Sequence, residues 1–444
     1  MYSDTMSLPV FLNDPDTGST SVDNVIDARG RIAPSRIDNP RHGRRLRVVL
    51  YSHDTMGLGH IRRNLRLARG LSESELPIEV LLITGSRESG GFSLPENVDV
   101  VVLPALHKAA DGSYRARNLG IGMDDLTALR SQIVCSTIQS FQPDLAIFDN
   151  VARGVNGELD QALRHIRDHG AIRCVLGLRD ILDEPEKVER EWRRQRSLET
   201  IRHFYHAIWV YGDARVYDPR SEYRLPADIA AMLEFTGYLD RRTQPSRRVE
   251  TSRRGEGIDR PFGLCLVGGG QDGAALALAF AAARHPEGMD AVIITGPHID
   301  PAAMERLQVL ARERAQLKVL EFVPEPTEFL QDAEFVVCMG GYNTVCEVIS
   351  FDRPALLVPR VVPRREQFIR AERLENLGIV DLLHPHNLSA DSLSEWIDGL
   401  PRRRQTSARK LIDMDGMQRV SQYLLDQVMR LEQPLQPRRR WAES

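Results

Sequence analysis

Short apolar runs alternate with longer amphipathic stretches along most of this chain. The runs are rich in Val, Ile and Leu, and most of the intervals between them are long enough for a crossover helix. Because this alternation is typical of parallel sheets covered on both faces, it predicts an α/β fold. The strand-like runs are 46–51, 79–83, 98–103, 144–148, 172–178 and 206–211 in the first half, and 262–267, 291–295, 318–322, 335–338 and 355–358 in the second.

One polar segment, residues 240–260, interrupts the alternation. It is rich in arginine and contains one Pro and two Gly, which indicates a linker between two domains. Both halves repeat one plan of strand, glycine-rich loop and helix, so we expect two Rossmann-like domains that face each other across a cleft. The expected segments are a mobile tail at 1–44, a first domain at 45–239, the linker at 240–260, a second domain at 261–400, a terminal helix at 401–432 and a tail at 433–444.

The composition excludes several classes of protein. A net charge of −4 over 444 residues argues against a sequence-independent nucleic-acid binder. The five cysteines are scattered without a CxxC pair, which favours a reducing cytoplasm and argues against a zinc site or disulfides. The longest apolar run, residues 274–283, is too short to cross a bilayer, and the chain opens without a recognisable secretory signal.

The basic residues are unevenly chosen. Only four of the 58 are lysines, and the others are arginines; genome composition explains such a bias without any function. An arginine cluster at residues 41–45 could contact anionic lipid headgroups, or it could simply be solvated.

The first glycine loop follows the strand at 46–51 and contains Gly57, Gly59 and His60. The following helix N-terminus is a natural anion site, and His60 at that position could act as acid, base or donor. The alternative is a histidine that only caps or packs locally. Because the spacing is not GxGxxG, a dinucleotide site is disfavoured.

Two further loops carry similar signals. Residues 268–273 place Gly269, Gly270 and Gln271 after a strand, which suits a phosphate, although the loop lacks the P-loop lysine and a simple tight turn is the alternative. Residues 338–347 combine a strand end with the start of a helix that also suits phosphate. Glu347 could hold a ribose or complement the helix dipole, and Glu366 with Gln367 could reach sugar hydroxyls or only cap a helix.

The stretch EFVPEPTEFLQDAEFVVCMGGYNTVCEVISFDRPALLVPRVVPRREQFIRAERL, residues 321–374, resembles the donor-binding domain of GT-B glycosyltransferases. The pattern is similar to the MurG-like family, with a C-terminal domain of the glycosyltransferase family 28 type, and to an uncharacterised group of predicted glycosyltransferases near it. The resemblance covers about residues 46–400 and is looser in the first half. It implies the GT-B fold.

The resemblance also implies roles for individual residues. Glycines 268–270 and Gln271 match the glycine–glutamine loop of the donor domain, and Glu347 matches the carboxylate that holds the ribose. Glu366 and Gln367 match the donor-sugar pair, and His60 matches the histidine on the acceptor side. Phe322 and Val323 match the position that reads the nucleotide base. The diphosphate turn is matched by Gly340, Gly341, Tyr342, Asn343 and Thr344.

The activity so implied is transfer of a sugar from a nucleotide-diphosphate donor, expected to be a UDP-sugar, to a hydroxyl acceptor. No DxD pair stands at an obvious strand end, so the sequence does not require a metal. The resemblance implies inversion at the anomeric centre without a metal or other cofactor. The candidate bases are His60, then Asp149, then Asp54, since each follows a first-domain strand. The acceptor is a glycan, a lipid-linked molecule or a small molecule.

Two features separate this chain from the MurG pattern. The first loop has one glycine fewer, and the donor-sugar pair is Glu-Gln rather than two glutamines. The resemblance implies a bacterial cytoplasmic enzyme, with peripheral contact to the inner membrane face left open. Two alternatives also stay open: a nucleotide-sugar epimerase on the same fold, which would need no acceptor, and a non-catalytic nucleotide-sugar-binding protein.

Overall fold

The computed structural model describes residues 44–53, 59–87, 93–108, 114–242, 256–269, 272–323 and 326–430. The predicted tails lie outside these ranges apart from Arg44, and so do residues 243–255 of the predicted linker. The elements described below belong to one structural unit that begins at Arg45.

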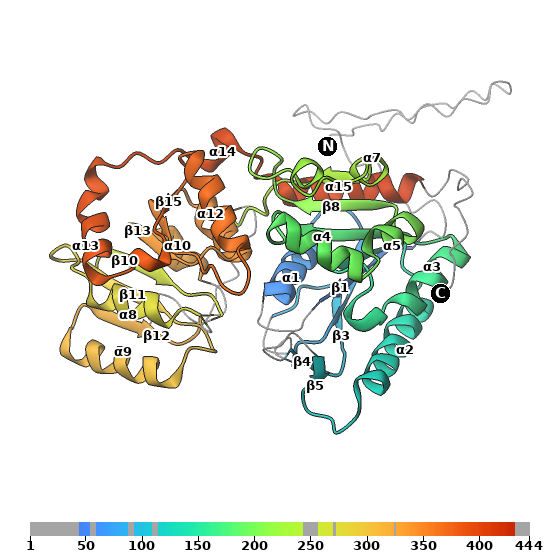
Figure 1. Ribbon diagram of the computed structural model, residues 1–444, viewed down its shortest axis with the longest axis horizontal. Coiled ribbons are helices and arrows are strands. Elements are labelled where there is room, and N and C mark those ends of the chain that lie inside the picture. The colour runs from blue at the N-terminus through green and yellow to red at the C-terminus, as the bar shows by residue number, and fades with distance from the viewer. Residues whose placement is uncertain are drawn as a thin grey trace, which may run out of the picture. The chain divides into compact units, whose positions relative to one another are not determined.

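The first sheet has seven parallel strands in the order β3-β2-β1-β6-β7-β8-β9. Three of its strands, β1, β3 and β8, are labelled in Figure 1. Its strands are β1 (Leu46–Ser52), β2 (Ile78–Thr84), β3 (Val98–Val102), β6 (Leu145–Asp149), β7 (Arg173–Arg179), β8 (Ala207–Tyr211) and β9 (Leu233–Phe235). A separate antiparallel pair is formed by β4 (Leu106–Lys108) and β5 (Tyr114–Ala116). The helices of this half are α1 (Gly59–Ser72), α2 (Met123–Phe141), α3 (Asp160–His169), α4 (Pro185–Arg194), α5 (Ser197–Phe204), α6 (Pro219–Glu222) and α7 (Ala227–Ala230).

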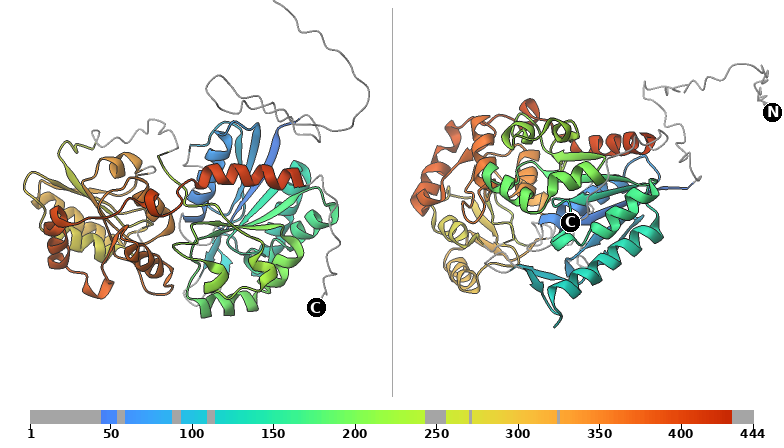
Figure 2. Two further views of the ribbon diagram at one scale, coloured as in Figure 1. Left: turned by 90° about the horizontal axis from the view of Figure 1, so that it is seen from above. Right: turned by 45° about the vertical axis from the view of Figure 1, so that its right-hand side comes forward.

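Both faces of the first sheet are covered by helices. Successive side chains of a strand point to opposite faces, so the run at β1 supplies two cores. Val48 and Leu50 belong to one apolar cluster with residues of α1, whereas Val49 and Tyr51 belong to another with residues of α2 and α3. Helix α15 (Gly416–Met429) contributes Leu424 to the first cluster and lies across this sheet (Figure 2). Because β1 is buried on both faces, its sequence is a nearly continuous apolar run and does not alternate between apolar and polar residues.

The second sheet has six parallel strands in the order β12-β11-β10-β13-β14-β15. They are β10 (Phe262–Leu266), β11 (Asp290–Ile294), β12 (Leu317–Leu320), β13 (Phe335–Cys338), β14 (Ala355–Leu357) and β15 (Asp381–Leu382). The helices are α8 (Ala274–Ala282), α9 (Pro301–Glu313), α10 (Thr327–Asp332), α11 (Tyr342–Ser350), α12 (Glu366–Asn376), α13 (Ala390–Gly399) and α14 (Ala408–Leu411). Residues of α8 and α13 share one apolar cluster with this sheet, and residues of α10 to α12 share another.

This architecture confirms the predicted fold class of two parallel α/β sheets. In each sheet the strand order reverses beside the first strand, between β1 and β6 and between β10 and β13. Such reversal points open a crevice at the carboxyl ends of the strands, where ligands bind in open α/β sheets. Over the part of the chain that the structure describes, no helix is long and apolar enough to span a membrane.

Candidate functional site

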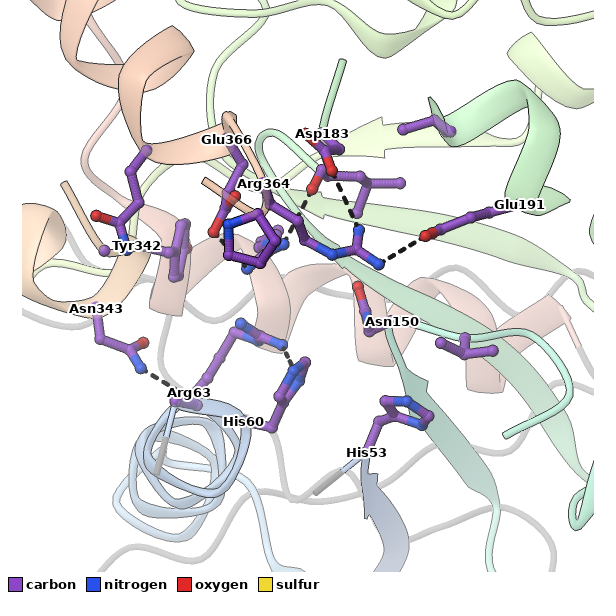
Figure 3. A pocket seen from close by; sticks show the side chains of 18 of the residues that line it. His53, His60, Arg63, Asn150, Asp183, Glu191, Tyr342, Asn343, Arg364 and Glu366 are labelled. Carbon is purple, nitrogen blue, oxygen red and sulfur yellow. Dashed lines mark hydrogen bonds and ion pairs between the residues drawn. The ribbon is translucent and has the colours of Figure 1, made fainter. Parts of the chain in front are cut away.

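A pocket of about 980 Å³ lies at the carboxyl ends of the central strands of both sheets (Figure 3). Its walls include residues that follow β1 and β6 in the first sheet and residues that follow β10 and β13 in the second. This volume is at the upper end of those that enclose small ligands. The predicted site residues that line it are Gly59, His60, Gly269, Gly341, Tyr342, Asn343, Thr344, Glu366 and Gln367.

Four predicted site residues cannot be placed in the pocket. Asp54, Gly57, Gly270 and Gln271 lie outside the described residues. Their roles stay predictions.

Two of the three predicted base candidates are brought together at the first sheet. Helix α1 begins at Gly59 and buries Ile61 and Leu65, which turns His60 towards the pocket. Asp149 ends β6, the neighbour of β1, and its Oδ2 accepts a hydrogen bond of 2.5 Å from Nδ1 of His60. The pair is therefore a histidine oriented by a carboxylate, the arrangement of a general base.

A third residue, Arg63, contacts both His60 and Asp149. One helical turn after His60, its guanidinium donates to Oδ1 of Asp149, and Nη2 lies 3.1 Å from Nδ1 of His60. Burial favours a neutral Asp149, but its contacts with Arg63 and then with His60 hold its pKa far below the usual value. An ionised carboxylate can only accept hydrogen bonds, so Nδ1 of His60 carries the proton. Nε2 is then the nitrogen that can accept a proton from a ligand.

His53, directly after β1, stands beside this pair. It lines the pocket, is 6% exposed, and its ring centroid lies 5.8 Å from that of His60. Burial, followed by the neighbouring His60, lowers the pKa of His53 to about 3. His53 therefore presents a neutral ring to the pocket, and among the described residues its Nδ1 has no hydrogen-bond partner.

The second wall is the N-terminus of α11, with Gly341 as its N-cap and no capping side chain. The first backbone N–H groups of a helix have no partner within it and favour anions. The Nδ2 of Asn343 donates to the carbonyl of Gly59 at 2.7 Å, so the start of α11 is bonded to the start of α1 (Figure 3). Both helix N-termini therefore adjoin the pocket.

Glu366 and Gln367, at the start of α12, form another part of the wall. Glu366 is 2% exposed, and its Oε1 accepts from Arg360 at 3.0 Å and lies 3.9 Å from Arg179. Burial opposes its charge, but Arg179 and then Arg360 lower the pKa of Glu366. Its Oε2 has no partner among the described residues. Gln367 uses Oε1 to accept from the backbone N–H of Arg360 at 3.2 Å, which leaves its amide nitrogen available.

Glu347 does not line the pocket in this conformation. It is 4% exposed, and its Oε1 accepts from Arg66 of α1 at 2.9 Å and lies 3.6 Å from Arg241. This carboxylate therefore joins α11 to α1 and to the residues after β9. A role at a ribose would require Arg66 to give way.

The other predicted positions have local explanations. Phe322 is 39% exposed, Val323 is buried, and the guanidinium of Arg62 lies 5.8 Å from the Phe322 ring centre. Gly340 is needed for packing, because a Cβ there would lie 2.7 Å from the carbonyl oxygen of Gln367.

The polar residues of the site that the sequence reasoning missed include His53, Arg63, Arg179 and Arg360. Some signals were present. Arg63 lies three positions after His60, a spacing that places both on one helix face. His53 and Arg179 stand at the ends of β1 and β7, which is where an α/β site is expected.

Comparison with known families bears on the second half of the chain. Residues 264–421 match the family model described as the glycosyltransferase family 28 C-terminal domain. A curated relative from Mannheimia succiniciproducens, a UDP-N-acetylglucosamine–N-acetylmuramyl-(pentapeptide) pyrophosphoryl-undecaprenol N-acetylglucosamine transferase, is 26% identical over 136 residues. That match covers 29% of this chain and 38% of the relative. The chain spans less than half the length of the curated relatives it matches.

Solved structures resemble the chain over a much larger part of its length. MurG of Acinetobacter baumannii has a TM-score of 0.53 at 14% identity, covering 86% of this chain and 99% of that one. A putative UDP-N-acetylglucosamine 2-epimerase of Listeria monocytogenes has a TM-score of 0.57 at 12% identity, covering 85% and 95%. At such low identity these likenesses show the fold alone. The chain has a GT-B fold, and residues 264–421 match the family 28 C-terminal domain, which confirms the resemblance read from residues 321–374.

Proposed function

We propose that this protein, with its family 28 domain, is a glycosyltransferase. It moves a sugar from a nucleotide diphosphate, expected to be UDP, to the hydroxyl group of an acceptor, with inversion and without a metal or other cofactor. The observation that carries the proposal is that His60, which is hydrogen-bonded to Asp149, lines the same pocket as the N-terminus of α11.

The donor half follows from the charge of the ligand. A nucleotide sugar leaves as a diphosphate, and helix N-termini stabilise the negative charge that develops on it. The diphosphate would bind at Gly341 to Thr344, close to the start of α1. Glu366 and Gln367 would bind the hydroxyls of the sugar, because each keeps a polar atom available at the pocket.

The acceptor half supplies the nucleophile. The acceptor oxygen forms a bond to the anomeric carbon while the bond from that carbon to the phosphate oxygen breaks, and the hydroxyl proton passes to Nε2 of His60. Leu182, Val188 and Trp192 line the first-sheet side of the pocket, where an acceptor would lie. Whether the acceptor is a glycan, a lipid-linked molecule or a small molecule stays open. We place the enzyme in the bacterial cytoplasm, with peripheral membrane contact as an alternative.

The first experiment identifies the donor. Thermal shifts are measured with UDP, GDP, ADP, dTDP and CDP, because a ligand that binds only the folded state raises the melting temperature. One nucleotide should stabilise the protein, and Gly341→Ala should reduce that effect. If no nucleotide at millimolar concentration shifts the melting of a folded sample, the proposal is wrong.

The second experiment tests turnover. The matching nucleotide sugar is incubated with an acceptor panel, and release of nucleoside diphosphate is compared for the wild type, His60→Gln and His107→Gln. His107 also lines the pocket and serves as the matched control. We expect His60→Gln to lose at least about a hundredfold in rate and to keep nucleotide binding. Conversion of the donor sugar without an acceptor would instead indicate an epimerase, and binding without any turnover would indicate a non-catalytic protein.

A further inference from the structure

Arg63 contacts both members of the His60–Asp149 pair and is used by no step described above. Its guanidinium donates to Oδ1 of Asp149, while His60 donates to Oδ2 of the same carboxylate. Arg63 is 2% exposed, and its guanidinium carbon lies 6.0 Å from the ring centre of Tyr211 and 5.6 Å from that of Tyr342. Two aromatic rings and a carboxylate therefore fix the cation in one place.

We propose that Arg63 is a positioning residue that keeps His60 in its neutral, proton-accepting form at neutral pH. It does so by sharing Asp149 with His60: the cation balances the carboxylate, so that Asp149 orients the imidazole without drawing a second proton onto it. This inference rests on the proposed function only for the use that His60 makes of its Nε2.

The argument begins with what Asp149 would do alone. A single carboxylate in contact with a histidine strongly favours the imidazolium form, because opposite charges stabilise each other at short range and in low dielectric. An imidazolium has no free nitrogen and cannot act as a base. With Arg63 bound to the second oxygen, His60 faces a neutral ion pair instead of a bare negative charge. The pull on a second proton is correspondingly smaller.

The same cation keeps Asp149 ionised. Asp149 is 1% exposed, and burial without a cation would favour the protonated acid. Arg63 reverses that preference, so the carboxylate can accept the Nδ1–H bond that fixes the tautomer of His60. Without Arg63, the His60–Asp149 pair therefore binds one more proton at higher pH than it does with Arg63, whichever of the two groups holds that proton.

The other groups around His60 do not replace this cation. In the described part of the chain, those that face the trio are neutral or belong to other contacts. His53, at the end of β1, is neutral because burial lowers its pKa to about 3. Burial also raises the pKa of Tyr211 on β8 and of Tyr342 on α11, so both are neutral. Arg179, at the end of β7, is a further buried cation that interacts with Arg63, and Glu366 lies 3.9 Å from it. Arg62 lies by Phe322, and Glu158 binds Arg130 and Tyr51.

The test compares the pH dependence of Arg63→Met, Arg63→Lys, Asp149→Asn and the wild type. In Arg63→Met the acidic limb of the kcat/KM profile should move to higher pH by about one unit or more. The variant should therefore lose a larger share of the wild-type rate at pH 7 than at pH 9. Arg63→Lys, which keeps the charge, should leave the limb near its wild-type position. A residue with only a structural role would lower the rate by the same factor at every pH.

An NMR titration separates this inference from the transferase proposal. The full chain is labelled at histidine and aspartate side chains, and the His60 signals are assigned with His60→Gln. The extra proton should appear on the His60–Asp149 pair at higher pH in Arg63→Met, and at lower pH in Asp149→Asn. This readout needs no activity, so it stands even if no acceptor or donor is turned over.

Folding is checked by thermal melting of every variant. If Arg63→Met fails to fold, the double variant Arg63→Met/Asp149→Asn removes both charges, and its His60 should keep the extra proton to higher pH than that of Asp149→Asn alone, which retains the cation 3.1 Å from the ring. A folded Arg63→Met whose His60 and Asp149 titrate as in the wild type would overturn the inference. Loss of activity in His60→Gln with unchanged titrations in Arg63→Met would do so while leaving the proposed function intact.

Discussion

Arg370 of α12 and Asp180, directly after β7, form a buried ion pair between the second sheet's helices and the first sheet. Arg370 donates to both carboxylate oxygens, at 2.8 and 2.6 Å, and to the carbonyl of Gly340 at 2.7 Å. Asp180 also accepts from the hydroxyl of Tyr238 at 2.9 Å and from the backbone N–H of Ile181 at 2.7 Å. Both side chains are at most 1% exposed.

We expect Asp180→Ala to lower the free energy of unfolding by about 4 kcal/mol or more. Breaking a buried pair from one side costs about 3–5 kcal/mol, because the remaining charge is left uncompensated. The unpaired hydroxyl of Tyr238 adds about 1–3 kcal/mol if water does not reach it. Removing both charges with Asp180→Leu/Arg370→Leu should recover most of the loss, since apolar replacements of a buried pair are often nearly neutral.

The assay is urea denaturation followed by circular dichroism, with Glu222→Ala as the matched control. Glu222 accepts a hydrogen bond of 2.8 Å from Arg373, which lies on α12 like Arg370. This pair is 29–41% exposed, so its loss should cost less than about 1 kcal/mol. Asp180→Ala should also weaken nucleotide binding, because Arg370 holds the carbonyl that precedes the N-cap of α11. Equal losses in Asp180→Ala and Glu222→Ala would refute the reasoning.

Three further predictions follow from single residues. The pKa of His53 is about 3 in the folded protein and 6.5 for the ordinary side chain, so below pH 6.5 only the unfolded chain binds the extra proton. The free energy of unfolding therefore falls by about 1.4 kcal/mol for each pH unit below 6.5. The variant His53→Leu should remove this slope between pH 6.5 and 5 in denaturation curves measured at several pH values. Gly340→Ala should destabilise the protein because its Cβ meets Gln367, whereas Gly341→Ala, with open space around its Cβ, should melt like the wild type but bind UDP more weakly; equal melting temperatures for the two would contradict this. Glu347→Gln should lower the melting temperature and leave UDP affinity within about threefold, because that carboxylate binds arginines rather than the pocket; an affinity loss without destabilisation would instead support the predicted ribose contact.

The central strands could be predicted because each is buried on both faces and must therefore be a continuous apolar run. The runs at 46–51 and 335–338 correspond to β1 and β13, the strands that lead into the pocket. The short strands β4, β5, β9 and β15 were missed. They have two or three residues each, too few to establish a period of two.

The site was predictable as far as topology determines it. His60 and Asp149 were expected at strand ends, and parallel neighbours bring such ends together even across 89 positions. Glu347 shows the limit of this reasoning. Its partner Arg66 is 281 positions away on a different sheet's helix, and no periodicity within either segment indicates that α1 and α11 lie against each other.

The excess of arginine over lysine has a structural component that composition alone did not predict. Arg370 contacts two carboxylate oxygens and a carbonyl at once, and Arg130 contacts Glu158 and the carbonyl of Pro104. A planar guanidinium can make these divergent bonds while buried, whereas the compact ammonium of lysine cannot match the fork. Genome composition can supply arginines on the surface, but these buried positions would lose their contacts on substitution by lysine, so part of the bias is a property of the fold and of its pocket.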